Sequence, residues 1–310
     1  MLIKLSIVFA AFGFIYYKFS SNTAFLNDFK YFINKSNLFT INNCIVLITL
    51  STLNWFFEVK KWQILIAPIK PISFKASLEQ SLGTLTASLI TPNRIGEYGA
   101  KALYYISSLR KRVLLITLLS NILQMLTTVC FGAVGLIIFF SIFENTILKI
   151  DLRVLFISSF ILLGTIIGVI AYKYNTLKLD NLLFRLKRFL RNYPLKNSFH
   201  GLLLSVLRYF TFSFQFFFIL ILFKVDINYL EGMMMISAMY LLASAIPSIF
   251  IFDVIVKGSV AVYLFAFIGV NELVVLSTTF LMWLLNFVLP SILGSYYVLS
   301  FKPMKASKVL

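Results

Sequence analysis

Long apolar segments recur along the whole chain, and this feature most constrains its fold. Hydrophobic residues make up 60% of the 310 residues, and charged residues make up only 13%. A soluble domain of this length would need a larger share of polar residues to cover its core. Runs of about 20 apolar residues are long enough to cross a bilayer as helices. The sequence therefore predicts an all-α integral membrane protein, with one polytopic membrane domain over residues 1–310.

The apolar segments are of two kinds. Two regions, residues 72–108 and 229–268, are interrupted near their middle by proline and by ionisable residues. Irregular backbone at membrane depth is tolerated only where it is buried in protein or lines a wet cavity, so we expect two re-entrant helical hairpins there. The uninterrupted segments are expected to be six transmembrane helices, at residues 3–19, 38–57, 112–143, 152–172, 199–223 and 273–299.

The distribution of basic residues predicts the orientation of the chain. With both termini in the cytoplasm, segments 58–81, 101–112 and 173–196 and the C-terminal tail hold most of the 28 Lys and Arg residues, as the positive-inside rule requires. Contact with anionic lipid then accounts for the net charge of +17, and nucleic acid is not an expected partner. Segment 173–196 also repeats leucine at helical spacing, which indicates either a basic amphipathic helix on the membrane or a simple connector.

The two interruptions share a sequence pattern. The first reads "ASLITPNRIGEYGAK" at residues 87–101, and the second reads "ASAIPSIFIFDVIVK" at residues 243–257. Each places an acid four residues before a lysine, on one face of a helix where the two can pair. Since the predicted hairpins enter from opposite sides, an inverted repeat of the kind found in transporters is one interpretation. Chance similarity between apolar stretches is the other.

Ionisable residues at membrane depth are the candidate functional residues, because such groups usually face a bundle interior and mark a pathway. In the first interruption, a proline favours the start of a new helix, whose free N–H groups at residues 93–96 would lie beside Arg94. This arrangement predicts phosphate binding. Gly96 and Gly99 would allow a ligand or another helix to approach closely. Alternatively, Arg94 and Glu97 form only a structural ion pair.

The remaining candidates lie in the second half of the chain. Asp253 and Lys257 either contact a substrate or neutralise each other. Arg208 lies well inside its predicted span with no acid nearby in sequence, so its partner would be Glu97, Asp253 or a lipid phosphate. The predicted substrate-binding residues are Thr91, Arg94, Gly96, Glu97, Lys101, Arg208, Asp253 and Lys257.

Several chemistries have no basis in the sequence. No Walker-type loop, dinucleotide glycine pattern or nucleophile motif is present. The chain has one histidine and two cysteines, which do not indicate a metal site. We therefore expect no cofactor, no metal, no ATP-driven pumping and no enzymatic activity.

The segment "TPNRIGEYGAKAL" resembles the lysylphosphatidylglycerol synthase transmembrane-region family, which is the flippase-like membrane domain of multiple peptide resistance factor. The family signature T-P-x-R-x-G-E is matched by Thr91, Pro92, Arg94, Gly96 and Glu97. In length and hydropathy the resemblance covers essentially the whole chain. A second family feature, a proline-containing loop before Gly-x-x-E-rich sequence, is only partly kept, because Asp253 stands where glutamate is usual.

The resemblance implies a stand-alone flippase-like protein of the bacterial inner membrane, which moves a lipid between leaflets. The lipid would be an aminoacylated phospholipid, another phospholipid or a polyprenyl-linked lipid with a phosphate headgroup. A separate synthase would supply it, since we expect no synthase domain in this chain. The alternatives are a membrane lipid-modifying transferase, with Glu97 or Asp253 as base, and a non-catalytic partner of a separate synthase.

Overall fold

The structure is a computed structural model that describes residues 40–89, 91, 94–143, 188–189, 191–246 and 253–301. Within these residues every regular element is a helix, which confirms the all-α class for the described chain. The predicted spans at residues 3–19 and 152–172, and most of the amphipathic segment 173–196, lie outside the described residues.

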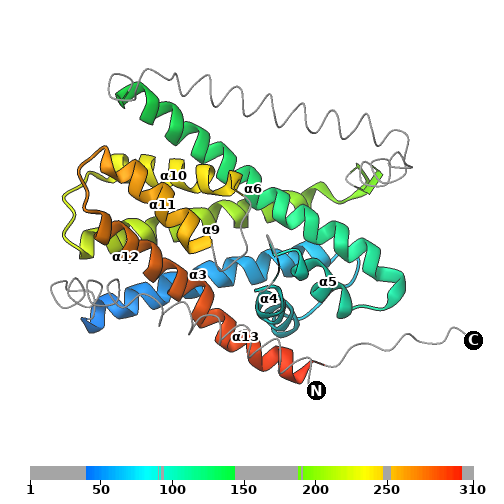
Figure 1. Cartoon of the computed structure of the whole chain (residues 1–310). Helices are drawn as coiled ribbons and strands as arrows, with labels where there is room; N and C mark the ends of the chain where they lie inside the picture. The colour runs from blue at the N-terminus through cyan, green and yellow to red at the C-terminus, as the bar shows by residue number, and fades with distance from the viewer. Residues whose placement is uncertain are drawn as a thin grey trace, which may run out of the picture.

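The described helices form two successive sets (Figure 1). The first set consists of α3 (Ile41–Ile66), α4 (Phe74–Ser88), α5 (Gly96–Leu103) and α6 (Ser107–Phe143). The second set consists of α9 (Leu195–Leu222), α10 (Tyr229–Ala245), α11 (Asp253–Ala266), α12 (Glu272–Trp283), the π-helical turn η1 (Leu284–Val288) and α13 (Leu289–Ser300). In each set a long helix is followed by two shorter helices that pack on each other, and then by another long helical stretch.

Three stretches are long and apolar enough to cross a membrane, namely α6, α9 and the continuous run Glu272–Ser300. They correspond to the predicted spans 112–143, 199–223 and 273–299. The helix predicted at residues 38–57 is longer than expected, since α3 continues to Ile66. At 1.5 Å per residue α6 is about 56 Å long, which exceeds the ~30 Å hydrocarbon core of a bilayer.

The first long helices of the two sets, α3 and α9, pack against each other in antiparallel orientation. Gln215 Nε2, near the end of α9, donates to Leu47 O, near the start of α3, at 3.0 Å. At the opposite end of the pair, Asn197 Nδ2 donates to Ile64 O at 2.8 Å. These two corresponding helices therefore join the two sets.

The last helices of each set cover the interrupted region of the other set. α13 packs on α4, and α6 packs on α10. A Cβ atom added at Gly294 of α13 would lie 2.2 Å from Leu82 O of α4, and one at Gly135 of α6 would lie 2.9 Å from Met234 O of α10. Both glycines allow backbones to approach where a side chain would not fit. In each set, therefore, the last helix packs on the first short helix of the other set.

The π-helical turn η1, within the stretch Glu272–Ser300, is hydrogen-bonded to α3. Pro290 has no N–H to donate to the carbonyl of Asn286, four residues earlier. Trp55 Nε1 donates to Asn286 O at 2.9 Å, and Ser51 Oγ donates to Leu285 O at 2.6 Å. Side chains of α3 therefore satisfy backbone acceptors in η1, where the regular α-helical hydrogen bonding changes inside an apolar bundle.

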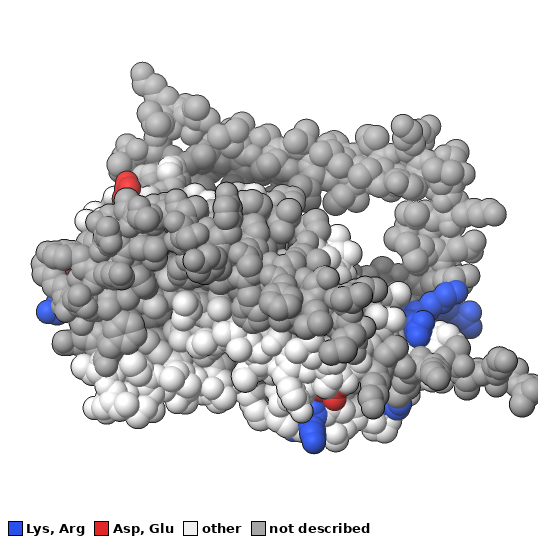
Figure 2. Space-filling model, turned by 60° about the horizontal axis from the view of Figure 1, so that its bottom comes forward, with Lys and Arg blue, Asp and Glu red and all other residues white. Residues whose placement is uncertain are grey.

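Exposed basic residues gather at one end of the described bundle. Lys70, Lys75, Lys111 and Arg112 are exposed near the α3–α4 and α5–α6 connections, and Lys224 is exposed at the opposite end, after α9. On the face in Figure 2 the coloured charges lie at the left end and in the right half, and the described surface between them is uncharged. Two lysines depart from the predicted charge distribution. Lys61 and Lys101, expected in cytoplasmic segments, are each only 1% exposed.

Candidate functional site

A row of polar residues on α3 faces the interior of the bundle. Ser51, Asn54, Glu58 and Lys61 follow the three- and four-residue spacing of one helix face, and all four are buried. Ending the span at residue 57 placed Glu58 and Lys61 in a loop, and this placement was wrong. The spacing of Asn54, Glu58 and Lys61 is the sequence signal that could have identified a polar interior face.

Arg208 of α9 is held by this polar row. Its Nη1 lies 2.6 Å from Glu58 Oε2, and its Nε donates to Asn54 Oδ1 at 2.9 Å. Lys61 Nζ lies 2.8 Å from the same Glu58 oxygen. The prediction that the partner of Arg208 comes from another part of the chain is confirmed, but within the described residues that partner is Glu58 and not Glu97.

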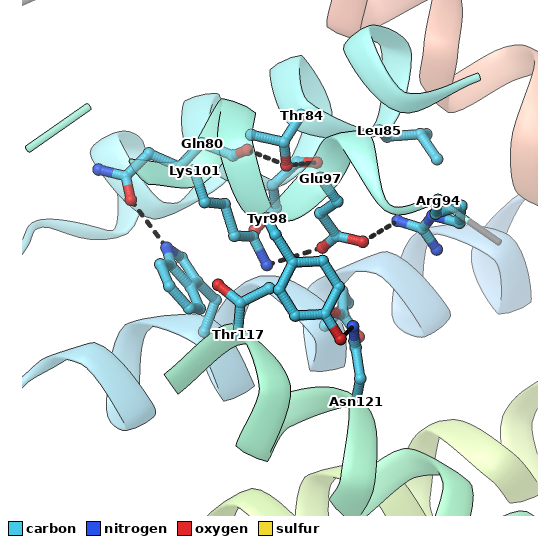
Figure 3. A network of polar contacts seen from close by, with 12 residues as sticks. Gln80, Thr84, Leu85, Arg94, Glu97, Tyr98, Lys101, Thr117 and Asn121 are labelled. Atoms are coloured by element: carbon cyan, nitrogen blue, oxygen red, sulfur yellow. Dashed lines mark hydrogen bonds and ion pairs between the residues drawn. The ribbon is translucent and has the colours of Figure 1, made fainter. Parts of the chain in front are cut away.

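A second group of ion pairs lies in the first interrupted region (Figure 3). Glu97 is held between Arg94 Nη2, at 2.9 Å from Oε2, and Lys101 Nζ, at 2.8 Å from Oε1. The predicted pairing of Glu97 with Lys101 across one helical turn is confirmed. Lys101 Nζ also lies 4.1 Å from the centre of the Trp62 ring, a distance at which a cation is attracted to the ring. Lys101 is therefore enclosed by protein.

The polar groups of the turn before α5 form hydrogen bonds with one another. Thr91 Oγ1 donates to Ser88 O at 2.8 Å and accepts from the N–H of Gly96 at 2.9 Å. The N–H groups of Arg94 and Glu97 donate to carbonyls within the same turn. Of the four N–H groups at residues 93–96 that were predicted to bind phosphate, those of Arg94 and Gly96 already have acceptors within the turn, and residue 93 lies outside the described part of the chain.

The glycines of this turn differ in their surroundings. A Cβ atom at Gly96 would lie 2.9 Å from Thr91 Oγ1, so the missing side chain allows the turn to close on itself. A Cβ atom at Gly99 would meet no described atom within 4 Å, so the predicted close approach is not seen there. Arg94 has a φ of 57°, in the left-handed region that residues with a side chain rarely adopt. The backbone of this turn is therefore strained at Arg94.

Gln80 of α4 fixes the second ion-pair group against α3. Its Oε1 accepts from Trp62 Nε1 and from Tyr105 OH, each at 2.8 Å. Ser77 Oγ of the same helix donates to Val59 O at 2.7 Å. These buried bonds hold α4 on the part of α3 that carries Lys61, so the two ion-pair groups lie beside each other.

A chain of buried amides extends the α3 polar row to η1. Asn54 Nδ2 donates to Asn286 Oδ1 at 2.7 Å, and Asn286 Nδ2 donates to Gln215 Oε1 at 2.8 Å. Asn54 therefore connects the guanidinium of Arg208 to the π-helical turn. Neither Asn286 nor Gln215 was among the predicted site residues. Asn286, four residues before Pro290 in an apolar stretch, is the residue that the sequence could have indicated.

A cavity of about 260 Å³ lies beside this network, bounded by α3, α6 and helices of the second set. Its apolar lining includes Phe212, Phe216, Trp283 and Phe287. Ser244, near the end of α10, is exposed and also lines the cavity. Its polar lining includes Arg208, Lys257, Asn54, Gln124, Thr128 and Asn286.

Only part of the predicted site reaches this cavity. Arg208 and Lys257 line it. Lys257 Nζ lies 5.5 Å from the ring centre of Phe287 and 6.0 Å from that of Tyr240. Asp253 is the first residue of α11, and its side chain lies outside the described part of the structure. The predicted residues that do not line the cavity are Thr91, Arg94, Gly96, Glu97 and Lys101.

Long apolar helices around a charged and hydrogen-bonded interior fit the class of all-α membrane proteins. The chain belongs to the family described as lysylphosphatidylglycerol synthase TM region, which matches residues 1–294. This match confirms the resemblance and indicates a membrane protein involved in lipid handling. Comparison with curated proteins and with solved structures finds no match.

Proposed function

We propose that the protein moves a lipid between the two leaflets of the bacterial inner membrane. The observation that carries the proposal is Arg208, a cation on the wall of a cavity inside apolar helices. A charged group at membrane depth is unfavourable unless it has a partner, and such groups generally mark substrate pathways. A cavity that combines aromatic surface with a few polar groups is suited to a lipid headgroup. Membership of a lipid-handling family supports the same assignment.

We infer that the two helix sets form an inverted repeat with re-entrant hairpins. α3 and α9 are antiparallel, and each set covers the interrupted region of the other. If α3 and α9 cross the membrane, the two-fold relation that exchanges them lies in the membrane plane. Transporters with such repeats open their site to alternate sides by moving one unit against the other. The packing of α13 on α4, and of α6 on α10, would be the interfaces that move.

Reconstitution into liposomes tests the proposal against its alternatives. Short-chain fluorescent lipids are followed by leaflet and by mass, with wild-type protein, Arg208→Gln and empty liposomes compared. We expect wild-type protein to exchange lipid between leaflets without changing its mass, and Arg208→Gln to slow the exchange at least about tenfold. A lipid of changed mass would favour a lipid-modifying transferase instead. No exchange and no change of mass, with any of the lipids supplied, would favour a non-catalytic partner of a separate synthase.

A further inference from the structure

A second concave region, which we call the outer groove, lies between α3, α4 and the stretch formed by η1 and α13. Its volume is about 500 Å³. Its lining includes large apolar side chains that are exposed, among them Ile48, Phe56, Leu289 and Leu293. An exposed apolar concavity of this size is typical of a surface that takes an apolar ligand.

The polar side chains in the lining of the outer groove are already hydrogen-bonded. Ser51 Oγ and Trp55 Nε1 donate to backbone carbonyls of η1, at 2.6 and 2.9 Å. Thr52 Oγ1 donates to Ile48 O at 2.8 Å. The other described lining residues are aliphatic or aromatic. Because no side-chain donor in this lining is left for a ligand, the outer groove suits a hydrocarbon chain and not a polar headgroup.

The outer groove is separate from the cavity of about 260 Å³. On α3, Ser51 and Trp55 line the groove, whereas Asn54 lines the cavity. On η1, Leu285 lines the groove and Asn286 lines the cavity. No described residue lines both, and hydrogen bonds join α3 to η1 between them. The outer groove is therefore a second candidate site and not an extension of the first.

A cation lies at one edge of the outer groove. Phe74, the first residue of α4, lines the groove, and Lys60 Nζ lies 5.2 Å from the centre of its ring. Lys60 Nζ also donates to Gln63 Oε1 at 3.2 Å, and no carboxylate of the described residues forms an ion pair with it. Lys70 and Lys75 are exposed near the same α3–α4 connection. Since an ammonium has three donors, Lys60 can still bind an anionic group.

We propose that the outer groove binds a hydrocarbon chain of an anionic lipid, with the lipid headgroup at Lys60. The apolar lining matches the chain, and the cation at the edge matches the charge of the headgroup. A concave wall contacts the chain on several sides, which favours this lipid over one lying on a flat helix surface. The proposal concerns a bound lipid, so it does not depend on transport through the cavity at Arg208.

Photocrosslinking of the purified full chain in neutral detergent tests the proposal. The probes are phosphatidylglycerol and phosphatidylcholine that carry the same diazirine-labelled chain, and the modified residues are identified by mass. We expect capture at lining residues such as Leu78 and Leu82, with phosphatidylglycerol captured about fivefold more than phosphatidylcholine. Capture spread evenly over the exposed apolar residues would overturn the proposal, because ordinary surface lipid gives this pattern. No capture in the groove with either probe would also overturn it and would favour a protein occupant, such as the predicted span 3–19.

Variants locate the effect in the outer groove. Leu293→Trp places a larger side chain in the groove from an exposed position, and it should reduce capture at least about tenfold. Its matched control is Ile292→Trp, at an exposed position of the same helix that is not among the described lining residues. Lys60→Gln should remove the preference for phosphatidylglycerol, and Lys111→Gln, at an exposed position on α6, should keep it. Equal effects of either variant and its control would contradict the proposal.

Discussion

Arg208 of α9 and Glu58 of α3 form an ion pair of 2.6 Å between two antiparallel helices. Glu58 is shared with Lys61, and Arg208 also binds Asn54, which in turn binds Asn286 of η1. One carboxylate and one guanidinium thus connect the ion pairs of α3 with the π-helical turn and with the cavity. This ion pair therefore lies where α3, α9 and the cavity meet.

Glu58→Gln is expected to destabilise the protein strongly. Removing one partner of a buried ion pair costs about 3–5 kcal/mol, because the remaining charges are left unneutralised. Here both Lys61 and Arg208 would lose their carboxylate. Thermal unfolding in detergent measures the effect, and Glu58→Gln with Arg208→Gln should lose less stability than Glu58→Gln alone. An unchanged midpoint for Glu58→Gln would contradict the assignment.

Glu97→Gln is expected to cost more stability than Arg94→Gln. The first change leaves Lys101 buried without its carboxylate, whereas the second leaves the pair of Glu97 with Lys101 intact. The side chain of Arg94 is also 26% exposed, so water screens its interaction. Unfolding midpoints of the two variants, measured in the same detergent, check this order. An Arg94→Gln variant as unstable as Glu97→Gln would show that the pair with Lys101 is not the principal one.

Gly294→Ala is expected to destabilise the contact between α13 and α4. The added Cβ atom would lie 2.2 Å from Leu82 O, and overpacking of this kind costs about 1–3 kcal/mol. Gly99→Ala is the matched control, because its Cβ atom would enter open space among the described residues and alanine favours a helix by about 0.5–1 kcal/mol over glycine. The unfolding midpoint should fall for Gly294→Ala only. A fall of the same size in both variants would contradict the close packing.

Trp55→Phe and Pro290→Ala are expected to be coupled. Trp55→Phe leaves the carbonyl of Asn286 without its donor, at a cost of about 1–3 kcal/mol. Pro290→Ala restores a backbone N–H that can reach this carbonyl, so the same Trp55→Phe change should cost less in that background. A double-mutant cycle on the free energy of unfolding measures the coupling. Additive effects would mean that Trp55 does not compensate for Pro290.

Local spacing made part of this structure predictable. The apolar runs indicated the long helices, the prolines located both interruptions, and the spacing of Glu97 and Lys101 indicated their pairing. The sequence did not indicate that the side chain of Thr91 would accept from the N–H of Gly96, because this bond depends on the exact fold of the turn.

Contacts between residues far apart in the sequence could not be predicted from local spacing. Glu58 fell outside the span predicted to end at residue 57, although α3 continues to Ile66 and Lys61 turns inward with Glu58 to pair beside Arg208. The pairing of Glu58 with Arg208 joins positions 150 residues apart and depends on the antiparallel packing of α3 and α9. The role of Asn286 likewise requires Trp55 and Asn54 to lie beside η1.

Leaflet exchange in proteoliposomes is the most direct test of the central claim, that Arg208 on the cavity wall serves lipid translocation. The rate is compared for wild type, Arg208→Gln, Arg208→Lys and the control Lys224→Gln, after each variant is shown to be folded. We predict unchanged exchange for Lys224→Gln, partial activity for Arg208→Lys and at least about a tenfold loss for Arg208→Gln. Wild-type exchange rates in a folded Arg208→Gln variant would contradict the account.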